Sequence, residues 1–113
     1  MPKDPPFVSP RSPSNARAQH GADPAETENA ARVAELSRLV ELEENARRFY
    51  HGAGDEEEAA KHGARRDQLA TKVSELGGSA PRPDECRSLL VAEDPGGVEA
   101  ELDAAYQAAG VSR

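Results

Sequence analysis

Two long stretches on either side of Gly52-Ala53-Gly54 constrain this chain more than any other feature. Residues 25–50 contain neither Gly nor Pro, and residues 55–76 contain no Pro. Both stretches are rich in residues that favour helix, mainly Ala, Leu, Glu and Arg. A connection of about four residues is typical of antiparallel neighbouring helices. The sequence therefore predicts an all-α chain organised around an antiparallel two-helix hairpin, residues 23–78.

The ends of both helices are marked by capping residues. Asp23 precedes a proline and is followed three residues later by Glu26, the pattern of a capped helix start. This first helix is predicted to span residues 24–51, with Gly52 in the left-handed conformation that ends helices. Asp55 and Glu58 repeat the capping pattern, so the second helix is predicted over residues 55–76.

The segments that flank the hairpin differ in character. Residues 1–22 hold five prolines and few apolar side chains, so a disordered tail is predicted. Residues 79–113 are predicted to be a linker followed by one or two short helices. One would span residues 84–92, and the other residues 97–109, where Val98, Leu102 and Tyr106 follow a helical spacing.

The chain has little material for a large core. Only 17 residues are Leu, Ile, Val or Phe, and 20 are Ala. These 17 make about 15% of the chain, which is below the roughly 20% level under which chains tend to be disordered. Stabilisation by a partner is therefore expected.

Charge and cysteine content limit the function. The net charge is −7, with +2 on residues 1–22 and −9 on the remainder, which argues against direct nucleic-acid binding. The single cysteine, Cys86, favours a reducing compartment, and the neighbouring Arg87 predicts a lowered thiol pKa. Neither a signal peptide nor a membrane span is apparent, so a cytoplasmic protein is predicted. No cofactor is predicted. The excess of Ala and Arg over Ile and Lys indicates a bacterial source.

The first helix presents a wider apolar face than one partner helix can cover. The function predicted from this surplus is a noncatalytic interaction module that self-associates or binds a helical protein. Five residues form the predicted contact surface: Leu39, Leu42, Ala46, Phe49 and Tyr50.

A metal-binding assembly is the alternative. The stretch from Glu44 to Tyr50 resembles the Ala-x-x-Phe-Tyr end of the Glu-x-x-Ala-x-x-Phe-Tyr stretch of rubrerythrin and other ferritin-like proteins. That resemblance implies a helical assembly with Glu44, Glu58 and His62 as ligands. Those relatives use Glu-x-x-His, whereas here Ala59 stands three residues before His62.

Two further resemblances concern the turn between the helices. The acidic run Asp55 to Glu58 at the tip is similar to that of coiled-coil factors that enter the RNA polymerase channel, which implies a polymerase regulator. The same run, together with Leu39 to Glu44 and Arg65 to Leu69, resembles a family of small uncharacterised actinobacterial helical-hairpin proteins. That second resemblance implies no activity.

Overall fold

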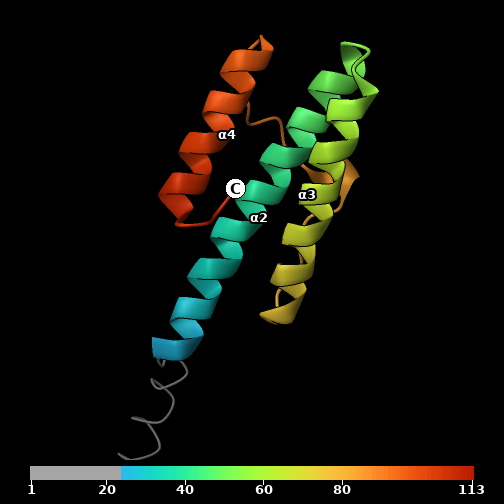
Figure 1. Ribbon diagram of the computed structural model, residues 1–113. Helices are drawn as coiled ribbons and strands as arrows, with labels where there is room; N and C mark the ends of the chain where they lie inside the picture. Colours follow the sequence, from blue (N-terminus) through green and yellow to red (C-terminus); the bar gives the residue numbers. More distant parts are fainter. Residues whose placement is uncertain (1–23) are drawn as a thin grey trace, which may run out of the picture. The chain divides into compact units, whose positions relative to one another are not determined.

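The computed structural model describes residues 24–113, so the predicted tail, residues 1–22, lies outside the described part of the chain. The all-α prediction is confirmed, because the described residues form helices and no strand. None of the helices within residues 24–113 is long and apolar enough to cross a bilayer. The helical elements follow in chain order (Figure 1): α2 (Pro24–Gly52), α3 (Glu56–Glu75), the short 3-10 helix η3 (Pro83–Glu85) and α4 (Pro95–Ala109).

Residues 31–113 form one compact unit, and residues 24–30, the start of α2, belong to a separate one. The candidate sites below all lie within residues 31–113.

The turn between α2 and α3 is built around Gly54. Gly52 is the last residue of α2, and the positive φ of +82° occurs at Gly54, two residues later than predicted. The Asp55 N–H donates to the carbonyl of Tyr50 at 2.9 Å, which closes the turn. The Asp55 carboxylate then accepts from the Glu58 N–H at 3.2 Å and caps α3, as the sequence predicts.

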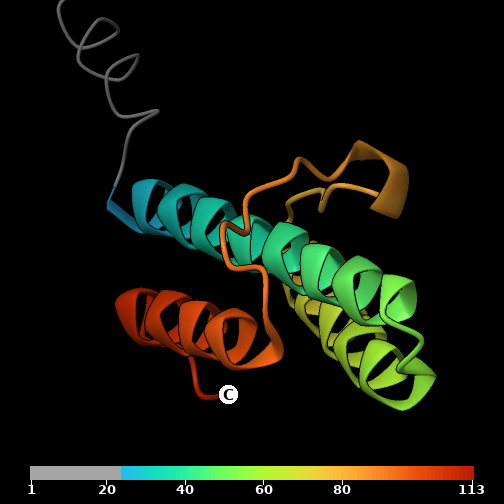
Figure 2. The ribbon, with the colours of Figure 1, turned by 90° about the horizontal axis from the view of Figure 1, so that it is seen from above.

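The predicted helix over residues 84–92 is wrong. Only Pro83–Glu85 forms a short 3-10 helix, and the chain then runs irregularly across α2 to the start of α4 (Figure 2). The local sequence of this segment favours a helix. Instead, side chains of the neighbouring helices accept hydrogen bonds from its backbone N–H groups. The N–H groups of Leu89 and Leu90 donate to Asn45, and those of Val91 and Ala92 donate to Glu101.

The middle of α2 is buried on every side. Residues 39–46 are eight consecutive buried positions, whereas a helix on a domain surface normally buries one face. α3 contacts these turns through Arg66, α4 through Tyr106, and the irregular segment through Leu89. The apolar side chains buried in the core are Leu36, Leu39, Val40, Leu42, Ala46, Tyr50, Ala59, Leu69, Val73, Cys86, Val98, Leu102 and Tyr106.

Candidate functional site

Four polar residues of α2 are buried by this packing: Glu41, Glu43, Glu44 and Asn45. Burying a carboxylate is costly unless it is hydrogen-bonded or paired. Each of the four forms hydrogen bonds with a different set of neighbouring groups, and these partners determine whether its side chain can take part in a binding site.

Glu43 joins all three long helices. Its Oε1 lies 2.5 Å from Nδ1 of His62 on α3, and its Oε2 accepts a hydrogen bond from the Tyr106 hydroxyl on α4. The side chains of Glu43 and His62 are 0% and 1% exposed. The imidazole is therefore held in one orientation by a buried carboxylate.

The second ring nitrogen of His62 faces another carboxylate. Nε2 lies 3.1 Å from Oε2 of Glu99 on α4, and the same oxygen accepts a hydrogen bond of 2.7 Å from the Tyr50 hydroxyl. The Tyr50 ring stacks on the imidazole with 5.2 Å between centroids and 5° between planes.

The two contacts of His62 have a chemical consequence. A carboxylate oxygen only accepts hydrogen bonds, so each ring nitrogen facing one must carry a proton or a cation. In the tautomer that carries its proton on Nδ1, the imidazole meets this condition at Nδ1 by donating to Glu43. Between Nε2 and Glu99 the same condition is met by a proton or by a metal ion.

Glu58 completes a group of three potential ligands. One atom each from Glu58, His62 and Glu99 lie within 4.8 Å of one another, the one group of this kind among residues 24–113. His62 is buried, and the two carboxylates are half-buried. Glu58 also binds Lys61 through Oε2 at 2.9 Å. Because Lys61 is an exposed and flexible side chain, this contact does not block the site.

Charge at the site is set by burial and hydrogen bonds. Burial opposes ionisation of Glu99, but the bond from Tyr50 and the contacts with Arg113 outweigh it, so the pKa of Glu99 lies below its usual value. Burial, and then the bond to Glu99, raise the pKa of Tyr50. Burial, and then the bond to Glu43, raise the pKa of Tyr106. The carboxylate of Glu99 is thus ionised at neutral pH, and both phenols keep the protons that they donate.

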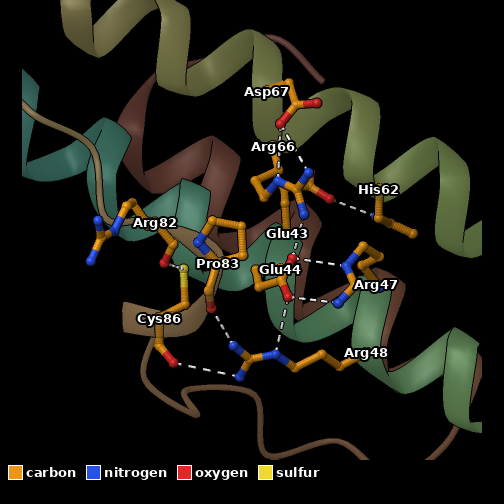
Figure 3. Close-up of polar contacts among 10 residues, drawn as sticks. All are labelled: Glu43, Glu44, Arg47, Arg48, His62, Arg66, Asp67, Arg82, Pro83 and Cys86. Atoms are coloured by element: carbon orange, nitrogen blue, oxygen red, sulfur yellow. Dashed lines mark hydrogen bonds and ion pairs between the residues drawn. The ribbon is translucent and has the colours of Figure 1, made fainter.

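Glu44 has a different environment, shown in Figure 3. Oε1 accepts from Arg47 at 2.9 Å and Arg66 at 2.6 Å, and Oε2 from Arg47 at 2.8 Å and Arg48 at 3.1 Å. Four donors occupy the roughly four lone-pair positions of a carboxylate. Glu44 has no oxygen left for a metal ion.

The predicted metal ligands are therefore brought together only in part. Glu58 and His62 lie together. The oxygens of Glu44 are hydrogen-bonded to arginine side chains, and Glu99 is the third member of the group instead. Glu99 is next to Val98 in the sequence, and it shares a helix face with Leu102 and Tyr106. Sequence reasoning missed it because the register of α4 against α3 depends on tertiary packing.

The predicted contact surface is largely covered by the chain itself. Leu39, Leu42, Ala46 and Tyr50 are each at most 4% exposed, and Phe49 is half-buried. The surplus face of α2 is covered by α4 and by residues 86–92. A partner could contact Ala46 and Tyr50 only after those segments had moved, whereas Leu39 and Leu42 also line a groove between α2 and α4.

The structure also bears on two further predictions, one for the acidic tip and one for the pKa of Cys86. The acidic tip residues Asp55, Glu56 and Glu57 are exposed, and Asp55 serves as the cap of α3. The predicted lowering of the Cys86 pKa is wrong, since burial and the nearby Glu44 charge raise it. Arg87, which was expected to lower it, instead binds Glu41 at 2.8 Å.

Comparison of the chain with protein-family models, characterised proteins and solved structures gave no match. All three family resemblances therefore stay predictions.

Proposed function

We propose that this protein is a divalent-metal-binding helical protein, with Glu58, His62 and Glu99 as ligands. The observation that carries the proposal is the pairing of His62 Nε2 with Glu99 at 3.1 Å while Nδ1 is held by Glu43. Histidine ligands of metals almost always donate their other ring N–H to a carboxylate or carbonyl group, the role that Glu43 has here.

The spacing and the ligand types fit this proposal. Ligands at 2.0–2.1 Å around a tetrahedral zinc ion lie about 3.3 Å from one another, close to the separation of Nε2 and Glu99. One imidazole and two carboxylates suit zinc and other first-row divalent ions. Three protein ligands leave a fourth position for water, as in metal sites that do chemistry.

Zinc titration of metal-free protein is the test. Zinc at a hundredfold excess over its Kd is expected to raise the Tm by roughly 10–20 °C, because it binds only the folded chain. Glu58→Gln removes a ligand at a half-buried position and is expected to weaken zinc binding at least about tenfold. Calorimetric titration measures both affinities.

The matched control is Glu57→Gln, which removes the same charge one residue away at an exposed position. It should leave the zinc affinity unchanged. Equal affinities for the two variants, or no zinc-dependent rise in Tm, would exclude the site.

Self-association is a second candidate function, favoured by a different observation. A groove of about 410 Å³ lies between α2 and α4, with Leu39 and Leu42 among its lining residues. On the α4 side it is lined mainly by small side chains: Ala104, Ala105, Ala108 and Ala109. Glu35, Arg38 and Glu101 also line it, so a second copy related by two-fold symmetry would pair opposite charges across the groove.

The groove makes a testable prediction about the oligomer. Ala108→Glu places bulk and charge in it and is expected to convert a dimer to a monomer, measured by sedimentation equilibrium. Ala100→Glu is the control, since this exposed alanine of α4 does not line the groove. Wild-type protein that stays monomeric at every concentration would exclude self-association through this face.

A further inference from the structure

A second polar cavity lies apart from the group formed by Glu58, His62 and Glu99. It has a volume of about 260 Å³ and is bounded by α2, the second half of α3 and the residues after α4. Four of its lining side chains are cationic in a chain whose net charge is −7: Arg32, Arg65, Lys72 and Arg113.

Local structure explains how these side chains come together. Arg65, Gln68 and Lys72 are spaced i, i+3, i+7 and share one face of α3. Gly110 ends α4 in the left-handed conformation with φ +69°, and the Val111 N–H bonds the Tyr106 carbonyl at 3.0 Å. The last residues of the chain are thereby turned back to form the opposite wall.

The cations differ in whether they already have partners. Arg32 donates to the Ala109 carbonyl at 2.7 Å, and Arg113 is paired with Glu99 and Asp103. Arg65 and Lys72 make no side-chain hydrogen bond or ion pair within residues 24–113. Two positive charges at this cavity therefore have no carboxylate within ion-pair distance among residues 24–113, although acidic residues outnumber basic ones in the chain.

We infer that this cavity binds a small oxyanion of the phosphate class, with Arg65 and Lys72 as its charged ligands. An arginine guanidinium matches two phosphate oxygens at once, and a lysine supplies a compact charge. Gln68 and Ser112 line the same cavity and offer further donors. Arg32 and Arg113 add positive potential from positions held by their own contacts.

The dimensions and the charge define the ligand further. A cavity of 260 Å³ is slightly smaller than the roughly 300–1,000 Å³ usual for drug-sized ligands. It suits inorganic phosphate, pyrophosphate or a short phosphate ester. The acidic remainder of the surface repels a long polyanion, which disfavours nucleic acid as the source of the phosphate.

Calorimetric titration with inorganic phosphate and with pyrophosphate tests this inference. The titrations use protein stripped of metal and chelator, at an ionic strength held constant with chloride, so that binding at the proposed metal site does not contribute. Millimolar or tighter binding of at least one anion is expected. The double variant Arg65→Gln/Lys72→Gln should weaken it by at least about tenfold, because two charge-assisted contacts are lost.

Arg82→Gln is the charge control, since Arg82 is exposed and lies outside this cavity. It should leave the anion affinity unchanged. The Tm of each variant checks that its fold is intact, which is expected because neither Arg65 nor Lys72 makes a side-chain hydrogen bond or ion pair within residues 24–113. No binding of either anion, or equal weakening by Arg82→Gln and the double variant, would overturn the inference.

Discussion

Glu44→Gln is expected to lower the free energy of unfolding by about 3 kcal/mol at neutral pH. The Glu44 side chain is 1% exposed and binds Arg47, Arg48 and Arg66. Removing one member of a buried ion pair typically costs about 3–5 kcal/mol, because the other charge is left without a partner. The lower end applies here, since Arg47 and Arg48 are 33% and 40% exposed and water partly solvates them.

The same carboxylate predicts a pH dependence of stability. Burial opposes its ionisation, but the bonds from Arg47 and Arg66 outweigh burial and lower the pKa of Glu44 from 4.5 to about 2. Because the pKa of Glu44 is lower in the folded chain, the unfolded chain binds this proton more tightly than the folded chain does at pH values between about 2 and 4.5. The stabilisation is therefore fully present above about pH 4.5 and is lost as the pH falls toward 2.

Urea denaturation at pH 7 and at pH 2–3 checks both statements. The difference in unfolding free energy between wild type and Glu44→Gln should be large at pH 7 and should shrink at the acidic end. Glu35→Gln is the matched control, because Glu35 and Arg32 form an exposed pair worth at most about 1 kcal/mol. Equal losses from the two substitutions at pH 7 would contradict the role assigned to Glu44.

Asn45→Ala is expected to lower the free energy of unfolding by about 2–4 kcal/mol. Asn45 accepts hydrogen bonds from the N–H groups of Leu89 at 2.5 Å and Leu90 at 3.1 Å, and it donates to the Arg87 carbonyl at 2.8 Å. Each backbone group that loses its partner costs about 1 kcal/mol, and more where water cannot replace the bond. The irregular segment over α2 has no helix or strand of its own to compensate.

Amide hydrogen exchange locates this effect. In Asn45→Ala the amides of Leu89 and Leu90 should lose their protection through local opening of the segment, whereas that of Leu69, within α3, should exchange faster only to the extent that the free energy of global unfolding falls. Unchanged protection at Leu89 and Leu90 would mean that Asn45 does not hold the segment in place.

The helix ends were largely predictable because they depend on neighbours along the chain. Asp55 caps α3 through Glu58, and Gly110 ends α4 with a positive φ. Capping bonds and left-handed glycines act within a few residues, so they can be read without knowing what packs against the helix. Over residues 84–92 the local preference for helix was outweighed by hydrogen bonds that the backbone N–H groups donate to the side chains of Asn45, Glu41 and Glu101, which lie elsewhere in the sequence.

The roles of the acidic residues on α2 could not be predicted in this way. In the sequence, Glu43 and Glu44 look like an exposed charged face, with each pairing to the arginine four residues on. In the structure both are buried, and Glu43 contacts His62 and Tyr106. Their burial depends on α3, α4 and residues 79–92 packing around α2, and the last two of these segments lie 35 or more residues further along the chain.

Local sequence signals predicted an all-α fold for residues 24–113, the approximate limits of the three long helices in that range and the capping of α3. Packing between segments distant in sequence sets which carboxylates are buried and places Glu99 rather than Glu44 opposite His62. The same packing covers most of the predicted contact surface of α2 with later parts of the chain. Helix formation itself responds to local hydrogen bonds and capping. The environment of a side chain on a helix is set by whatever segments pack against it, and helical spacing alone does not specify their register.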